Sequence, residues 1–140
     1  MRNIEFRGIV KEKGMSECWI KGSLLHITKT YKGEEDEQEC DIYQIITEDG
    51  VGSFIDKNTI GQYTGLHDKN GQEIYEGDII SDGYEKCLVV WVKKYAGFML
   101  KLLEEKNDFR EWSNPFIDLG KEDEVIGNIY ENPELLEEEK

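Results

Sequence analysis

The sequence predicts an all-β protein. Short apolar or alternating runs recur along its 140 residues, and turn-forming residues separate them. No segment carries the 3.6-residue apolar period of a long amphipathic helix. Aromatic residues make up 11% of the chain, which favours a packed core although 34% of the residues are charged.

The first half of the chain contains several short strand candidates. Residues 3–10 alternate apolar with charged side chains, as a strand with one buried face does. After a turn, residues 17–20 are expected to return as the second strand of a hairpin. Further strands are predicted at residues 23–28, 40–47 and 51–55. Residues 32–39 contain no apolar side chain, so a charged loop is expected there.

The second half is more regular. Strands are predicted at residues 73–80, 85–92, 97–103 and 124–131, with turn signals between the first three. Pro115 argues against a central strand in the region around it. Asn132 as N-cap and Pro133 after it predict a short helical turn or an acidic tail over residues 132–140.

Residues 64–80, "TGLHDKNGQEIYEGDII", have the composition of turns in a β-fold. Asn70 and Gly71 tolerate positive φ, and Asp68 can accept backbone N–H groups in an Asx-turn. Gly77 is expected to form a bulge in the strand over residues 73–80, with Asp78 bonding local backbone groups. We interpret these five residues as structural turn residues.

The alternative is a chemical site in the same stretch. Glu76 and Asp78 would be an acid pair, with His67 and Asp68 as a base or metal ligands. The other histidine, His26, is far away in the sequence, and no HExxH, GxSxG, P-loop or GxGxxG motif occurs. We therefore predict no catalytic, metal-binding or cofactor-binding residue.

Cysteine use and hydropathy favour a reducing cytoplasm. Cys18, Cys40 and Cys87 are odd in number and widely spaced, so a disulfide framework is not expected. Cys87 lies in an apolar run and is expected to be a buried, inert thiol. No signal segment and no apolar run near 18 residues is present, so no membrane association is predicted.

The net charge of -14 is unevenly distributed. Residues 1–30 carry six basic and three acidic side chains, a sum of +3, so residues 31–140 carry -17. A chain this acidic is not expected to bind nucleic acid generally. The acidity is interpreted first as a means of solubility, and second as a surface that imitates a polyanion. A small basic face near the N-terminus leaves direct contact with nucleic acid as a third hypothesis.

Aromatic residues are concentrated in the second half, where most are expected to form the core. Those near turns are expected to be exposed and to form an interaction surface: Tyr84, Tyr95 and Trp112.

Four segments resemble the YopX-like proteins of phages and prophages of low-GC Gram-positive bacteria. They are residues 3–10, 59–66, 64–80 and 125–138, the last reading "VIGNIYENPELLEE". Gly8-Ile9-Val10 departs from the usual opening of the family, and His67 stands where the family commonly has lysine. The resemblance implies a mainly β protein with a small N-terminal β-region and an SH3-like C-terminal barrel. It also implies homo-oligomers, and it supplies no catalytic residue or cofactor.

A composition shift near residues 56–63 predicts where these parts divide. We expect a small N-terminal β-region with a charged loop over residues 1–60, the barrel over 61–131 and the acidic tail over 132–140. Strand edges and the apolar pair Leu135 and Leu136 are expected to support self-association.

The predicted function is that of a phage or prophage accessory protein, a non-enzymatic binding or assembly module. Its expected partner is itself, with a host or phage protein as a further partner. The alternatives are an acidic inhibitor that imitates nucleic acid, and a direct nucleic-acid binder that uses the barrel.

Overall fold

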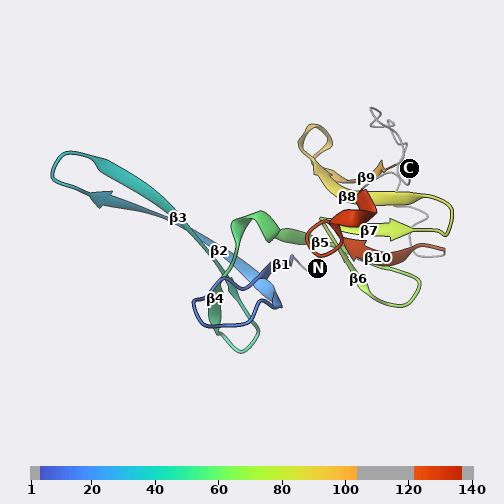
Figure 1. The fold of residues 1–140 in the computed structure, drawn as a ribbon, viewed down its shortest axis with the longest axis horizontal. Coiled ribbons are helices and arrows are strands. Elements are labelled where there is room, and N and C mark those ends of the chain that lie inside the picture. Colours follow the sequence, from blue (N-terminus) through green and yellow to red (C-terminus); the bar gives the residue numbers. More distant parts are fainter. Residues whose placement is uncertain (1–3, 104–121, 137–140) are drawn as a thin grey trace. The chain divides into compact units, whose positions relative to one another are not determined.

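The computed structural model describes residues 4–103 and 122–136 of the chain. The chain divides into two compact units, residues 3–62 and residues 63–140, and each is described by itself (Figure 1). Strands dominate both units, and the helical segments among the described residues are single 3-10 turns. The all-β prediction is therefore confirmed.

The N-terminal unit is built from antiparallel strands in the order β4-β3-β2-β1. Gly61 and Gln62, at the start of β5, pair with β1. The elements of this unit are β1 (Phe6–Ile9), β2 (Trp19–Lys32), β3 (Glu37–Ile46), β4 (Gly52–Phe54), the 3-10 turn η1 (Lys57–Thr59) and the start of β5 (Gly61–His67).

The core of the N-terminal unit is small. Val10, Ile45 and Ile55 are its buried apolar side chains. Gly8 allows their close packing, because a Cβ at this position would lie 3.0 Å from Cδ1 of Ile55. The hydroxyl of Thr59 accepts a hydrogen bond from the amide of Ile9 at 2.9 Å, which fixes η1 against β1. The core thus covers only the inner ends of β2 and β3.

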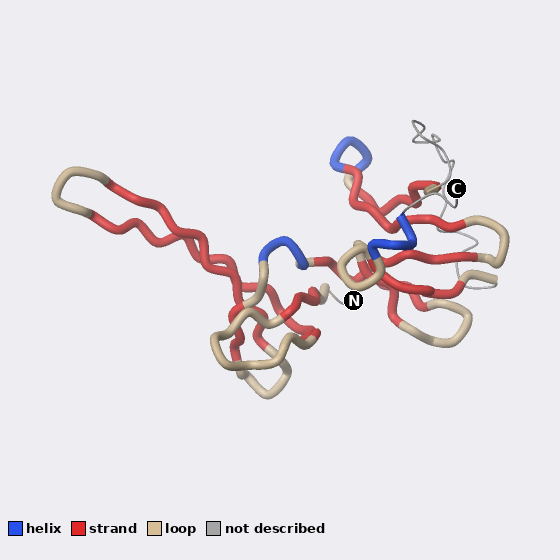
Figure 2. The backbone as a smooth tube through the Cα atoms, viewed as in Figure 1, coloured by secondary structure: helices blue, strands red, loops and turns tan. Residues whose placement is uncertain are grey.

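The outer parts of β2 and β3 form a hairpin that extends away from the rest of this unit (Figures 1 and 2). We call residues 24–43 the arm. At about 3.3 Å per residue, the strand pairs beyond the base reach roughly 30 Å. A two-stranded hairpin by itself is at best marginally stable in water, and along this length the arm consists of two strands only.

The C-terminal unit contains a four-stranded antiparallel sheet in the order β10-β7-β8-β9. The rest of β5 pairs with β6. The elements are β6 (Glu73–Tyr75), β7 (Asp78–Ser81), β8 (Lys86–Val92), η2 (Lys93–Tyr95), β9 (Gly97–Leu102), β10 (Glu124–Asn128) and η3 (Pro133–Leu136). Six buried side chains form its core: Ile74, Ile80, Cys87, Val89, Leu100 and Leu102.

Three sequence predictions about elements need correction. Residues 17–20 and 23–28 are not two strands, because one continuous strand, β2, runs through Trp19–Lys32. The charged loop expected at residues 32–39 is reduced to residues 33–36, since Glu37 begins β3 opposite Lys32. Residues 73–80 form two strands with a turn between them, where a single bulged strand was expected.

The SH3-like barrel is not established by these strands. Among the described residues the strands form antiparallel sheets and no closed barrel. The barrel stays a prediction from the resemblance.

Candidate interaction surface

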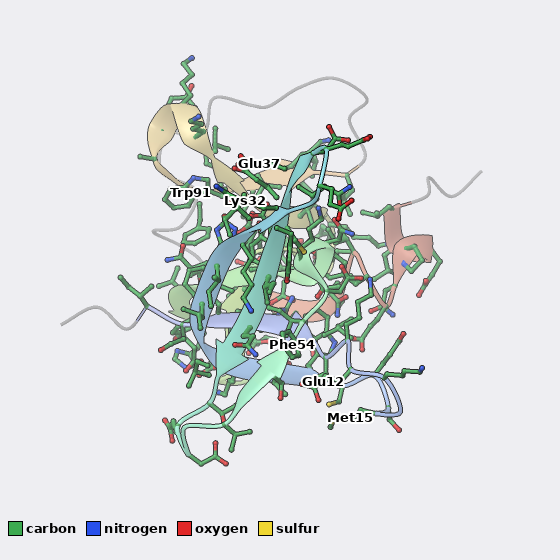
Figure 3. The ribbon with its side chains drawn as sticks, turned by 90° about the vertical axis from the view of Figure 1, so that its left-hand side faces the viewer. Glu12, Met15, Lys32, Glu37, Phe54 and Trp91 are labelled. Atoms are coloured by element: carbon green, nitrogen blue, oxygen red, sulfur yellow. The ribbon has the colours of Figure 1, made fainter. Side chains whose placement is uncertain are left out.

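The arm is held in a single register by ten antiparallel residue pairs, from Ser23 opposite Ile46 to Lys32 opposite Glu37. At its tip the amide of Gly33 donates to the carbonyl of Asp36 at 2.8 Å and closes the turn. Figure 3 shows Lys32 and Glu37 at this end of the arm, where the ammonium and carboxylate groups are 3.6 Å apart. Opposite charges therefore support the pairing where no core is present.

One face of the arm carries most of its apolar side chains, together with Lys29, Gln38 and Gln44. Leu25, Ile27 and Tyr31 alternate along β2, and their exposed fractions are 39%, 37% and 55%. Residues opposite each other in an antiparallel pair share a face, so Ile42 joins Ile27 and Cys40 lies opposite Lys29. We call this set, Leu25, Ile27, Tyr31, Cys40 and Ile42, the apolar face. Aliphatic and aromatic side chains aligned this way are typical of a surface that another chain covers.

The opposite face is polar and internally bonded. The rings of His26 and Tyr43 stack with centroids 4.4 Å apart. The carboxylate of Asp41 accepts a hydrogen bond from the Thr28 hydroxyl at 2.7 Å and lies 3.0 Å from Nε2 of His26. These two contacts, Thr28 first and His26 second, hold the pKa of Asp41 below its ordinary value. The polar face is thus ordered by its own contacts.

Both edges of the arm are open along most of their length. β1 pairs with β2 only through Trp19–Gly22, and β4 pairs with β3 only through Gln44–Ile46. No other described strand pairs with residues 23–32 or with residues 37–42. The two edges have opposite charge: Lys29 and Lys32 lie on β2, whereas Glu37, Glu39 and Asp41 lie on β3. Edge strands of this length are a template for pairing with another chain.

A shallow hollow of about 400 Å³ lies at the base of the arm. Its lining includes Lys11, Lys57 and Asp56, with the aromatic rings of Tyr43 and Phe54. The Lys11 ammonium lies 4.0 Å from the Asp56 carboxylate, so opposite charges in the hollow largely compensate each other. Beside it, the amide of Phe54 donates to Glu12 at 3.0 Å, and both residues are labelled in Figure 3. Asp41, from the polar face of the arm, also lines the hollow.

Metal-ligand clusters and membrane-spanning helices are both absent from residues 4–103 and 122–136. No group of three or more His, Cys, Asp and Glu side chains there is placed to hold a metal ion. None of the described helical segments is long and apolar enough to span a membrane. All three cysteines carry free thiols, with Cys87 buried and the other two exposed.

The turn over residues 68–72 is organised around one buried carboxylate. Asp68, only 5% exposed, accepts hydrogen bonds from the amides of Asn70, Gln72 and Val125 at 2.8, 2.9 and 3.0 Å. Burial alone would raise the pKa of Asp68, but the three amide donors outweigh it and lower the pKa. Gly71 provides the positive φ of +81° that the turn needs.

Gly77 and Asp78 separate β6 from β7. Gly77 has a φ of +89°, and a Cβ there would lie 3.1 Å from Cε2 of Tyr130. Its amide donates to Val89 and its carbonyl accepts from Ile129, so the turn lies close to two neighbouring segments. The carboxylate of Asp78, 1% exposed, accepts from the amide of Tyr75 at 2.8 Å. A turn at Glu76 and Gly77, with Gly77 in the left-handed conformation, thus takes the place of the expected bulge.

The predicted interaction residues that the structure describes lie in separate elements of the C-terminal unit. Tyr84 is 91% exposed and Tyr95 is 49% exposed, each in a separate turn of the C-terminal unit. Trp112 lies outside the described residues. Leu135 is half-buried beside Gly127, whereas Leu136 is 41% exposed.

Two further surfaces were missed from the sequence. One is the arm. The alternation of Leu25, Ile27 and Tyr31 was a signal for it, but the charged residues that follow suggested a loop. The other is the aromatic pair of Trp91 and Phe98 on β8 and β9, with ring centroids 4.9 Å apart.

The fold and the arm define an all-β protein whose longest element, among the residues described, is an exposed two-stranded hairpin. A family model described as YopX protein matches residues 5–137, so the chain belongs to the YopX family. The search of curated proteins found no match. Among solved structures the chain is similar to protein EF1440 from Enterococcus faecalis, at 23% identity and a TM-score of 0.44. That similarity covers 98% of this chain and 100% of the other.

Proposed function

We propose that this protein is a non-enzymatic assembly module of a phage or prophage that works in the host cytoplasm as a homo-oligomer. The observation that carries the proposal is the arm. It exposes an apolar face and two strand edges, and nothing in the described N-terminal unit covers them. A second copy supplies the missing cover, because a folded hairpin of this length is otherwise marginal.

The absence of enzymatic activity is part of the proposal. The ionisable residues of the stretch 64–80 bond to backbone amides, and Asp68 in particular uses three of them. A carboxylate occupied in this way positions a turn and is poorly placed to accept a proton from a substrate. The SH3-like barrel of the C-terminal unit is retained as a proposal that rests on the resemblance alone.

The test is the mass of the protein in solution as a function of concentration, measured by light scattering in a reducing buffer. We expect the full-length chain to form a defined oligomer. A variant in which residues 27–42 are replaced by Asn-Gly keeps the base of the hairpin, and it should be a monomer. A wild-type chain that is monomeric up to high micromolar concentration would refute the proposal.

A matched control concerns the C-terminal leucine. Leu136→Lys removes the exposed apolar side chain of η3, which was the other candidate for self-association. If the arm carries the assembly, the mass of this variant should equal that of the wild type. A monomeric Leu136→Lys variant would instead locate the contact at η3.

A second candidate function is inhibition of a host protein that binds nucleic acid. The supporting observation is the arm tip, where Glu34, Glu35, Asp36, Glu37 and Glu39 are all exposed. Spaced carboxylates of this density resemble the charge of a nucleic-acid backbone. A pull-down from host extract tests it. Capture of a DNA- or RNA-binding protein that added DNA displaces would support it, and capture unaffected by DNA would oppose it.

A further inference from the structure

The two edges of the arm differ in charge, and this difference restricts how copies can pair. Within residues 24–32, β2 carries Lys29 and Lys32 and no acidic side chain. Within residues 37–43, β3 carries Glu37, Glu39 and Asp41 and no basic side chain. Charged side chains on an edge normally discourage pairing, since like charges meet. In this protein the charges oppose pairing of β2 with β2 of another copy, and of β3 with β3 of another copy. They do not oppose pairing of β2 with β3 of another copy.

We infer that copies of this chain associate head to tail, with the β2 edge of one arm paired to the β3 edge of the arm of the next copy. The inference rests on the proposed assembly function and names its contact. When neighbouring arms point the same way, β2 of one copy and β3 of the next run antiparallel. The strand pairs already described in the N-terminal unit are antiparallel as well.

This pairing also explains the two faces of the arm. Arms added edge to edge keep their faces in register, so the apolar faces of successive copies become one continuous surface. On the polar face, Lys32 of one arm comes beside Glu37 and Glu39 of the neighbouring arm, whereas Lys29 lies on the apolar face. A contact of this kind uses different surfaces on the two partners, so it closes into a ring when the rotation allows.

Charge reversal tests the contact. The acidic variant is Lys29→Glu with Lys32→Glu, which makes both edges acidic. The basic variant is Glu37→Lys with Glu39→Lys, which makes both edges basic. We expect each variant alone to associate at least tenfold more weakly than the wild type, measured by light scattering in reducing buffer. Mixed in equal amounts, they should associate as tightly as the wild type, with the two variants alternating.

The mixture separates contact between copies from damage within one arm. Each variant loses the Lys32–Glu37 ion pair inside its own hairpin, and mixing cannot restore it. Recovery on mixing therefore reports pairing between arms. As a second check, a variant with all four substitutions regains the internal pair. It should assemble by itself but should not form mixed oligomers with the wild type, as read by native mass spectrometry.

Three results would overturn the inference. A basic variant that keeps the wild-type mass indicates that β3 is not in the contact. A mixture that stays monomeric while both variants show native circular dichroism excludes β2–β3 pairing. Free mixing of the four-substitution variant with the wild type shows that edge charge does not select partners. A wild-type protein that is monomeric is a separate outcome from these three results, because it refutes the proposed assembly and not only the contact.

Discussion

Asp68 stabilises the C-terminal unit because three backbone amides converge on its carboxylate. Replacement by Asn keeps an acceptor for Asn70 and Gln72 but turns an amide donor toward the amide of Val125. We expect Asp68→Asn to lower the free energy of unfolding by about 1–3 kcal/mol at neutral pH, as when a buried donor loses its partner. Urea denaturation measures it.

The pH dependence of that loss follows from the lowered pKa of Asp68. A carboxyl group with a pKa lower in the folded than in the unfolded chain adds stability above its unfolded pKa, about 3.9. That contribution disappears as the pH falls through the folded pKa. The difference between wild type and Asp68→Asn should thus be constant from pH 7 to about 5 and shrink below about 4. A difference that grows on acidification would contradict this assignment.

Gly77 and Gly71 form a matched pair of left-handed glycines, with φ of +89° and +81°. A methyl group at Gly71 meets nothing within 4 Å, whereas one at Gly77 meets the ring of Tyr130. We expect Gly71→Ala to cost roughly 1–2 kcal/mol from backbone strain alone, and Gly77→Ala to cost more. Equal losses in urea denaturation would show that the Tyr130 ring moves aside freely.

At the scale of elements, the polar face of the arm is organised around Asp41. Thr28→Val removes the first hydrogen-bond donor to its carboxylate and keeps the shape of the side chain. The pKa of Asp41 should then rise toward its ordinary value, because Thr28 is the largest cause of the lowering. Titration of the carboxyl carbon signal by NMR measures the change. An unaltered titration would assign the lowering to His26.

The elements also show what the sequence could and could not predict. The β8 and β9 strands were predictable, because their apolar runs are bounded by strong turn signals such as Asp82-Gly83. The turn at Asn70-Gly71 was predictable for the same reason, because it depends on residues that are adjacent in the sequence. The arm was not predictable in full, because Glu37, Gln38 and Glu39 extend only through their partners Lys32, Tyr31 and Thr30 on β2. Cross-strand pairing depends on residues distant in sequence.

The candidate surface was missed for a related reason. Tyr84 and Tyr95 were selected as aromatic residues near turns, and both are exposed, at 91% and 49%. Exposure alone does not make a surface, and the two residues lie in separate turns. The apolar face depends instead on the register that sets Ile42 opposite Ile27.

For the whole molecule, the balance of 31 acidic and 17 basic side chains makes binding to nucleic acid unfavourable. We expect no retention of double-stranded DNA in a filter-binding assay at low salt, where electrostatic attraction is strongest. The basic arm variant, Glu37→Lys with Glu39→Lys, is measured in the same assay, because it replaces two acidic side chains of the exposed arm by basic ones. Retention of DNA by the wild type would revive direct binding through the N-terminal unit.

The thin base of the arm affects how long a solitary copy would survive in a cell. The arm is a ribbon of two strands above a core of few side chains, so it opens more readily than the sheet of the C-terminal unit. Proteases cut such openings, and Glu34 and Glu35 at the tip are natural cleavage points for an enzyme that prefers glutamate. If copies assemble through the arm as proposed above, those without a neighbour would be trimmed and removed, while those within a complex would persist. Degradation would therefore remove surplus subunits and leave finished complexes.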